Sequence, residues 1–461
     1  MSEGGAARTL YTAQWVLPIS SAPIRDGAVG VVGSSIAYVG VMDALPDEWQ
    51  SAKRVELGAA VLLPGLVNTH THLELTAMRG FLEGLAFRDW LATLTRARRE
   101  CVVGDSLYDS ACAGVEEALR NGITTCADTT ESGEPLAAMR DVGVRGIGYL
   151  EVFGPDPSQC DDAIRDLAAR VEMRRAHDTD LVRTGISPHA PYTVSASLFT
   201  AAAKLAESQQ LPIAVHIAES HAESQFVRDA QGPFADGLRA RGIAVRQQAR
   251  SPIALLEQCG VLRTRPLLIH TVHIDERDIA SIAEHDATVA HCPISNLKLG
   301  HGIAPLRELR AAGISVGLGT DSVASNDRMD LLGESRQAAL LAALQQKIPD
   351  ALSARDALAL ATIGGARALR LDDRIGTLEI GKAADLAAFA IDSPDAQPIH
   401  DAAVTLVHVL AGAQRASLVV VNGEMRVRHG ALLRTDHARE SRVHALGQRL
   451  QAWRRINRTV T

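Results

Sequence analysis

The middle of the chain alternates short apolar runs with stretches of helical periodicity, and this alternation constrains the fold most strongly. Segments such as 198–208 and 331–346 have the apolar spacing of amphipathic helices. Such alternation is typical of βα units and a parallel sheet. Eight units over about 250 residues predict an α/β fold with a TIM-type (β/α)8 barrel. The eight predicted strands end near Asn68, Asp128, Val152, Ser187, His216, His270, His291 and Thr320.

Both ends of the chain have short β-type segments instead. Apolar runs cover 10–17, 27–32 and 35–39 near the start, and 384–391 and 417–421 near the end. Asn422 and Gly423 are the residues that a tight hairpin turn requires. We therefore predict a small β-sandwich that both ends build together. Its parts are residues 1–63 and 373–461, the latter with a terminal helix, and residues 64–372 form the catalytic barrel.

Composition and charge argue against several classes of partner. A net charge of −7 and an aromatic content of 3% do not favour nucleic acid. The sequence has no stretch of eighteen or more consecutive apolar residues, so no membrane span is predicted. The six cysteines form no CxxC pair, and the first residues do not resemble a signal peptide. We expect a cytoplasmic protein that acts on a small molecule.

Two histidines, His70 and His72, stand two positions apart where the first strand of the predicted barrel ends. Residues two apart face the same side of a strand, so both imidazoles can reach one metal ion. In a barrel of this kind the chemistry lies at the C-terminal ends of the strands. An HxH pair by itself also occurs on ordinary surfaces, so the rest of the chain has to decide.

A third histidine and an acid follow later strands. His216 ends one strand and Asp321 follows the last one. Each residue also has a structural interpretation without a metal. His216 could be a hydrogen-bonded histidine of the core, and Asp321 could be the N-cap of a helix in the segment 322–329. Four ligand-type residues at three strand ends favour a metal centre. Three imidazoles and a carboxylate suit one divalent ion, zinc or iron(II), and leave a position for water.

A metal ion lowers the pKa of its water to about 7, and a proton carrier is then needed nearby. Glu219 lies three residues beyond His216 and is predicted to carry that proton. The alternative is a solvent-facing loop acid. His270 ends the sixth strand and is predicted to orient or stabilise the nucleophile.

Further polar and aromatic residues follow predicted strands or lie in nearby loops. His273 is interpreted as a structural or loop residue, while His291 fits a pocket position and a buried structural position equally well. The segment 295–302 has the polar, glycine-rich character of a substrate-contacting loop. The predicted substrate contacts are His189, Trp90 and Asn296.

Taken together, these motifs resemble the amidohydrolase superfamily, in the branch with triazine hydrolases, guanine deaminase and methylthioadenosine/S-adenosylhomocysteine deaminases. PGLVNTHTHLE, SPHAPY, HIAES, HCPISNLKLGHGIAPL and GTDSVASN occur in family order, followed by IGTLEIGKAADLAAF. Ser187 stands where other amidohydrolases carry a carboxylated lysine, so one metal ion is implied. The resemblance implies acid–base catalysis by Glu219, assistance by His270, and metal ligation by His70, His72, His216 and Asp321.

The resemblance implies hydrolytic deamination of an amino-substituted heterocycle, with release of ammonia. Segments 69–75 and 87–91 and the insertion 232–252 are similar to aminodeoxyfutalosine deaminases. We therefore expect a 6-aminopurine nucleoside: aminodeoxyfutalosine, adenosine, methylthioadenosine or S-adenosylhomocysteine. Guanine, pterin, cytosine or triazine substrates and cyclic-amide hydrolysis are the alternatives. The intact ligand set argues against a non-catalytic scaffold, and a homodimer is expected.

Overall fold

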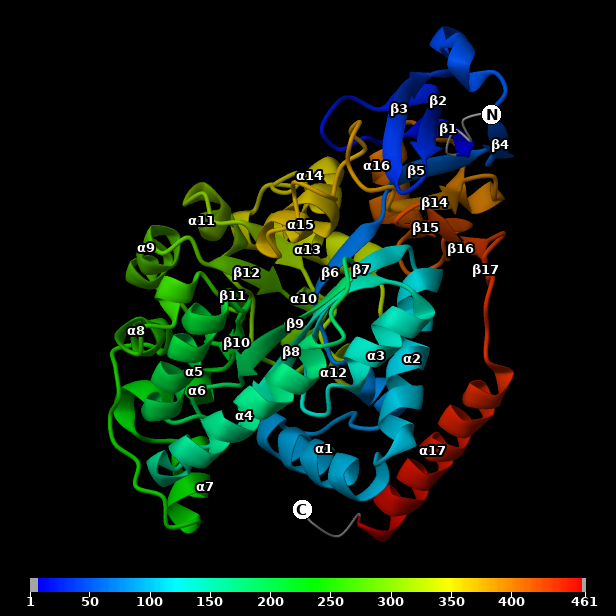
Figure 1. Cartoon of the computed structure of the whole chain (residues 1–461). Coiled ribbons are helices and arrows are strands. Elements are labelled where there is room, and N and C mark those ends of the chain that lie inside the picture. The colour runs from blue at the N-terminus through cyan, green and yellow to red at the C-terminus, as the bar shows by residue number, and fades with distance from the viewer. Residues whose placement is uncertain (1–6, 458–461) are drawn as a thin grey trace.

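The computed structural model describes residues 7–457. Two four-stranded parallel sheets lie at its centre (Figure 1). Every predicted strand end lies within three residues of an observed one. The first sheet consists of β6 (Leu66–Thr71), β7 (Ile123–Thr130), β8 (Arg145–Val152) and β9 (Val182–Pro188). The second consists of β10 (Ala214–Ile217), β11 (Leu267–His270), β12 (Thr288–His291) and β13 (Val316–Leu318).

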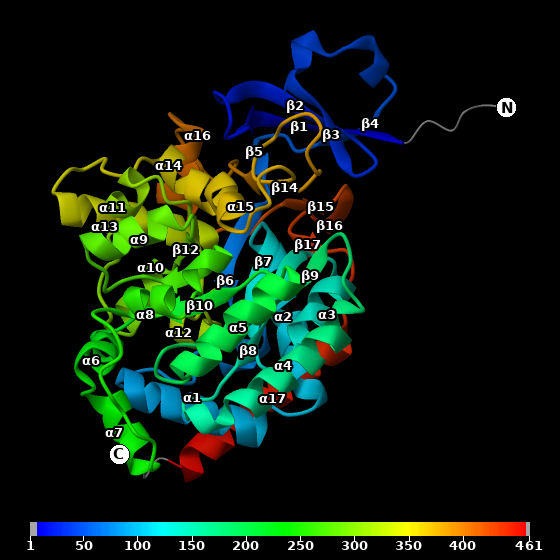
Figure 2. The same ribbon diagram turned by 60° about the vertical axis from the view of Figure 1, so that its left-hand side comes forward.

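Helices follow the strands and cover the outer side of these sheets (Figures 1 and 2). The predicted helical segments 198–208 and 331–346 are confirmed. In the first, Ser195 caps the helix and an apolar face is buried. The main helices between strands are α2 (Asp105–Arg120), α3 (Glu134–Val142), α4 (Cys160–Arg175), α5 (Ala196–Gln209), α9 (Glu276–Glu284), α11 (Leu306–Ala311) and α13 (Leu331–Gln346).

Shorter helices lie in the connections at the C-terminal ends of the strands or lead toward the end of the chain. They are α6 (His221–Asp229), α7 (Pro233–Ala240), α8 (Pro252–Gln258), α10 (Pro293–Lys298), α12 (Val323–Asn326), α14 (Ala354–Ala359), α15 (Gly365–Ala368) and α16 (Ala402–Val404).

Backbone hydrogen bonds join the two sheets at both of their seams. Between β9 and β10, Ile186 N donates to Pro212 O at 3.0 Å, and between β13 and β6, Asp321 N donates to His70 O at 2.9 Å. Gly319 makes the second approach possible, because a Cβ there would lie 2.9 Å from the Cβ of His70. The molecule is therefore an α/β protein whose parallel strands contact one another across the seams.

The two ends of the chain meet, as predicted, and they form one nine-stranded sheet. The strands β5 and β14 pair antiparallel and so join the N-terminal part to the C-terminal part. Asn422 and Gly423, with φ of 51° and 83°, form the predicted hairpin turn between β15 and β16. The strands form one continuous hydrogen-bonded sheet around a shared apolar cluster. They are β1 (Arg8–Val16), β2 (Ile24–Val32), β3 (Ser35–Val41), β4 (Lys53–Glu56), β5 (Ala60–Pro64), β14 (Leu386–Ala390), β15 (Leu418–Val421), β16 (Glu424–Arg428) and β17 (Ala431–Leu432).

The predicted terminal helix, α17 (His437–Ile456), returns to the central part and lies beside α1 (Phe87–Cys101) and α2 (Figures 1 and 2). Arg442 pairs with Asp109 of α2 at 2.6 Å. A buried ion pair between Arg145 and Asp385, at 2.9 Å, ties the central sheet to the nine-stranded sheet. Among residues 7–457, no helix is long and apolar enough to cross a membrane.

Candidate metal centre

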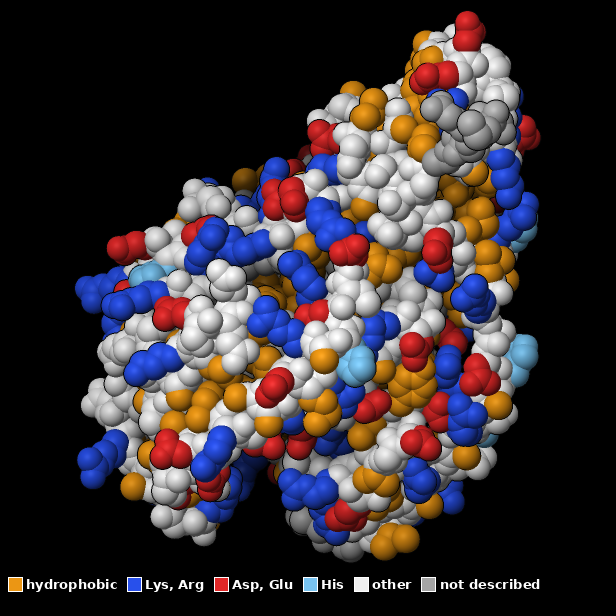
Figure 3. Space-filling model, viewed as in Figure 1, with side chains coloured by type: hydrophobic (Ala, Val, Ile, Leu, Met, Phe, Trp, Pro, Cys, Tyr) orange, Lys and Arg blue, Asp and Glu red, His pale blue; other side chains and the backbone are white. Residues whose placement is uncertain are grey.

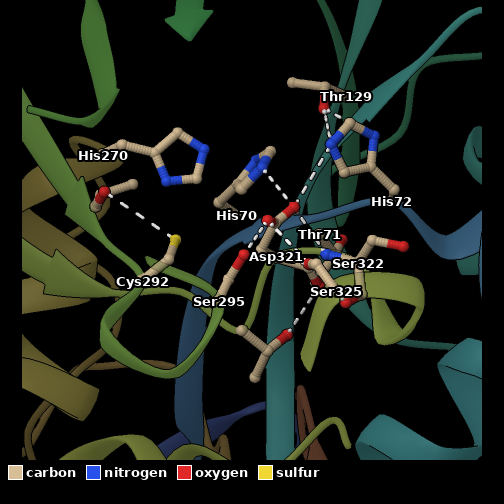
Figure 4. Close-up of polar contacts among 12 residues, drawn as sticks. His70, Thr71, His72, Thr129, His270, Cys292, Ser295, Asp321, Ser322 and Ser325 are labelled. Carbon is tan, nitrogen blue, oxygen red and sulfur yellow. Dashed lines mark hydrogen bonds and ion pairs between the residues drawn. The ribbon is translucent and has the colours of Figure 1, made fainter. Parts of the chain in front are cut away.

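Strand ends bring the four predicted ligands together. His70 ends β6 with His72 just beyond it, His216 lies in β10, and Asp321 follows β13. The ring of His70 lies 4.8 Å from that of His72 and 4.8 Å from that of His216. Asp321 Oδ1 lies 3.1 Å from His70 Nε2 and 3.5 Å from His72 Nε2 (Figure 4). These side chains converge on one point.

The charge states in this cluster suit a cation. Burial lowers the pKa of His70 and His72, and it holds the pKa of His216 well below its usual range, so the imidazoles are neutral. Burial raises the pKa of Asp321, but the hydrogen bond with His70 opposes this, and that pKa lies well below its usual range. Neutral imidazoles with one carboxylate form a donor set for a divalent metal ion.

The two structural interpretations of these residues fail. Within residues 7–457, His216 Nδ1 is buried without a hydrogen-bond partner, so His216 is not a satisfied core histidine. The N-cap of α12 is Ser322, whose side chain accepts from Ala324 N at 3.0 Å, and not Asp321. Neither alternative accounts for the position of its residue.

Asp321 is held by serines from the segment 295–302, which was predicted to contact substrate, and from the residues directly after Asp321. Its Oδ2 accepts hydrogen bonds from Ser295 Oγ at 2.6 Å and from Ser325 Oγ at 2.9 Å, and its Oδ1 accepts from Ser322 N at 2.6 Å (Figure 4). The backbone at Asp321 is left-handed, with φ of 57°. Such surrounding contacts fix the direction in which a ligand points. In the sequence, the serines after Asp321 in GTDSVAS were the feature that could have indicated these hydrogen bonds.

Glu219 is buried beside two histidines. Its Oε1 lies 3.6 Å from His270 Nε2 and 3.3 Å from His301 Nε2. Burial opposes ionisation, but these two histidines lower the pKa of Glu219. The carboxylate of Glu223 fixes the loop by accepting from the backbone N of Ala218 at 2.8 Å and of Glu219 at 2.9 Å. The interpretation of Glu219 as a solvent-facing acid is therefore wrong. His301 lies in the segment 295–302, which was predicted to contact substrate, but no contact with Glu219 was predicted for it.

A hydrogen bond orients the ring of His270. Its Nδ1 lies 2.9 Å from Asn296 Oδ1. An amide oxygen only accepts, so Nδ1 carries the proton of this hydrogen bond, and Nε2 faces Glu219. Asn296 thus positions His270. The contact of Asn296 with substrate stays a prediction, and its Nδ2 has no partner within the described chain.

His189 lies next to the cluster and faces an acid that the sequence did not single out. Its Nδ1 lies 2.8 Å from Thr193 Oγ1, and its ring lies 4.8 Å from that of His216. Glu151, near the end of β8, places Oε1 4.0 Å from His189 Nε2. That oxygen is buried and has no hydrogen-bond partner in the described part of the chain. In the sequence, the position of Glu151 at the C-terminal end of an apolar run could have indicated that it belongs to the site.

The remaining candidates lie farther from the cluster or at its edge. Trp90 packs into an apolar cluster beneath α1, with Leu94 and Met78, so its predicted substrate contact is not supported by a direct contact with the histidines. His291 is buried, and burial lowers its pKa to about 4. His273 is half-buried near His221, with 6.1 Å between the ring centres. The roles of Trp90, His273 and His291 stay predictions.

Comparisons with known proteins agree with this geometry. The model of the Amidohydrolase family matches residues 61–426. A 5-methylthioadenosine/S-adenosylhomocysteine deaminase of Moorella thermoacetica is 33% identical, with 91% of this chain and 94% of the relative covered. An adenosine deaminase from Xanthomonas campestris with bound zinc matches with a TM-score of 0.85 at 29% identity, covering 97% of this chain and 99% of that one. Atrazine chlorohydrolase from Arthrobacter aurescens, complexed with zinc, matches with a TM-score of 0.82 at 29% identity, covering 95% and 100%.

The family model spans most of the chain, and the strand ends that it covers carry the histidines and the acid described above. The zinc-bound structures agree with a divalent metal at this histidine-rich cluster. The chain therefore belongs to the amidohydrolase family and is a hydrolase that acts on carbon–nitrogen bonds.

Proposed function

We propose that this protein removes the amino group of a 6-aminopurine nucleoside by hydrolysis, using one zinc ion held by His70, His72, His216 and Asp321. The observation that carries the proposal is the convergence of these four ligand-type residues beside the buried acid Glu219. The names of the relatives, deaminases of adenine nucleosides, support the substrate class. Iron(II) accepts the same donor types and is the alternative metal.

We also propose that the eight parallel strands close into a (β/α)8 barrel over residues 64–372. The backbone hydrogen bonds at both seams support this closure. The nine-stranded sheet around one apolar cluster supports a sandwich made of residues 1–63 and 373–461. In such a barrel all eight strand ends face one opening, which explains why ligands from distant segments meet. The expected cytoplasmic location and homodimer stay predictions.

The residues around the cluster divide the proton transfers between them. When bound, the metal ion supplies the Lewis acidity that makes water nucleophilic at neutral pH. Glu219 takes one proton of the attacking water and delivers it to a ring nitrogen. It then takes the second proton, from the hydroxyl group now on the carbon, and gives it to the leaving amine. His270, whose proton is held on Nδ1 by Asn296, presents Nε2 to the attacking water and to Glu219. Ammonia leaves, and a carbonyl replaces the amino group.

The test is ammonia release by purified protein of measured metal content. The panel contains adenosine, 5′-methylthioadenosine, S-adenosylhomocysteine, aminodeoxyfutalosine, guanine, cytosine, a pterin and atrazine. We expect one equivalent of ammonia from one or more adenine nucleosides, and loss of turnover after chelation with recovery on adding zinc. If the metal-loaded protein releases no ammonia from any adenine nucleoside, the proposal is refuted. If the protein releases chloride from atrazine and no ammonia from the other compounds, its reaction is dehalogenation and not deamination.

A further inference from the structure

One buried acid of β7 takes no part in the proposed proton transfers. Many Asp and Glu side chains of this protein lie on the surface in contact with water, as Figure 3 shows. Asp128, near the end of β7, is instead 0% exposed. Burying a carboxyl group costs free energy unless hydrogen bonds replace its contacts with water. The hydrogen bonds of Asp128 therefore indicate what it does.

One oxygen of Asp128 holds the residues on both sides of His72. Its Oδ2 accepts a hydrogen bond from Thr71 Oγ1 at 2.8 Å and from Leu73 N at 2.6 Å. Leu73 begins the 3-10 helix η3 (Leu73–Met78), whose first backbone N–H groups have no partner within the helix. His72, at the N-cap position, offers them no side-chain hydrogen bond. Asp128 therefore caps this helix from another strand and fixes the backbone before and after the ligand.

The strand ladder alone does not fix this segment, because β6 is irregular here. Asn68 pairs with Cys126 and Thr71 pairs with Asp128, so β6 advances by one residue more than β7 between the two pairs. An extra residue of this kind is typical of a β-bulge, which re-aims the side chains next to it. Asp128 acts at the first position where the two strands are in register again. The direction of His72 after the irregularity therefore depends on this side chain.

The ring of His72 is held less firmly than that of His70. The side chain of His70 is 1% exposed, whereas that of His72 is 16% exposed. Thr129 Oγ1 lies 3.2 Å from Nδ1 and 3.4 Å from Nε2 of His72, so this hydroxyl group does not favour one orientation of the ring (Figure 4). The backbone around residue 72 therefore contributes more to the direction of this ligand.

We propose that Asp128 is a positioning residue for the metal ligand His72, because its Oδ2 fixes the backbone on both sides of that ligand. The role needs an oxygen that accepts two hydrogen bonds, and a carboxamide oxygen has the two lone pairs for it. The other oxygen, Oδ1, is buried without a hydrogen-bond partner within residues 7–457, so an amide nitrogen in its place breaks no contact. This inference rests on the proposed metal centre and adds a residue to it.

The test compares Asp128→Asn, which keeps an accepting oxygen, with Asp128→Ala, which removes both oxygens. We expect Asp128→Ala to lower the affinity for Zn²⁺ by about tenfold to a hundredfold, the usual cost of losing a contact that orients a ligand. Asp128→Asn should bind Zn²⁺ as the wild-type protein does. Competition between each purified protein and a chelator of known affinity measures this and needs no substrate.

The control is Asp278→Ala. Asp278 is 1% exposed on α9 and accepts hydrogen bonds from Ser251 Oγ at 2.6 Å and from Asp275 N at 3.2 Å. Both Ala variants remove a buried, hydrogen-bonded acid and should lower the melting temperature, but Asp278→Ala should leave the Zn²⁺ affinity unchanged. An equal loss of affinity in the two variants overturns the inference, because it reflects general destabilisation.

Two further results overturn the inference: an unchanged Zn²⁺ affinity in Asp128→Ala, and an affinity of Asp128→Asn as low as that of Asp128→Ala. If Asp128→Ala does not fold, Thr71→Val takes its place, because it removes one of the two donors to Oδ2 at nearly the same shape. Thr71→Val should weaken Zn²⁺ binding, and unchanged binding overturns the inference. If the wild-type protein binds no Zn²⁺, the proposed function itself fails.

Discussion

The metal centre with Glu219, which we call the floor of the site, and the pocket between α1 and α7 hold charge in opposite ways. On the floor, Asp321 is buried among neutral imidazoles and accepts three hydrogen bonds from serines. In the pocket, Arg88 and Arg241 are exposed and form no ion pair within the described chain. A buried charge needs fixed partners because removing it from water is costly, whereas an exposed arginine remains solvated. Changes on the floor should therefore be severe, and changes in the pocket mild.

The largest expected effect is at Asp321. Asp321→Ala should lose bound metal and activity together, by more than about a thousandfold, beyond the tenfold to hundredfold cost of outer contacts. Metal content by mass spectrometry and ammonia release measure this. Asp321→Asn keeps a residue that tolerates the left-handed backbone and separates ligand loss from misfolding. Asp350→Ala, at an exposed position, is the control. Full activity with stoichiometric metal in Asp321→Ala would refute the ligand set.

Glu219 should behave differently from the ligands although it is equally buried. Glu219→Gln should keep its metal and lose at least about a hundredfold in kcat, the usual contribution of general acid–base catalysis. Steady-state kinetics with metal-quantified protein decide this. Glu284→Gln, an exposed acid on α9, is the matched control. An unchanged kcat would remove Glu219 from the mechanism.

A smaller effect on the floor is expected from the serines that hold Asp321. Ser325→Ala removes the 2.9 Å hydrogen bond to Oδ2 and should weaken metal affinity by about tenfold, as loss of an outer contact to a ligand does. Competition with a chelator measures the affinity. Ser335→Ala removes another buried serine, which bonds backbone oxygens of α13 and α14, and should leave the affinity unchanged. Equal affinities in the two variants would show that Ser325 does not support the ligand.

Much of the floor was predictable because strands have a simple rule. Residues two apart share a face, so His70 and His72 could be paired from spacing alone, and the polar residue after each apolar run marks the same edge of a parallel sheet. The outer contacts were not predictable. Ser295 lies on α10 and Ser325 on α12, and only folding brings both hydroxyl groups to Asp321. Glu151 and the contact of His301 with Glu219 were missed for the same reason.

The sequence by itself determined the order of strands and helices, the joining of both chain ends, and the residue types of the metal centre. These depend on local periodicity, turn chemistry and the chemistry of each side chain. The tertiary structure alone decided that Asn296 orients His270 and that arginines of α1 and α7 face one pocket. Hydrogen bonds and charge–charge contacts of this kind join segments far apart in sequence, and no periodic pattern records their geometry.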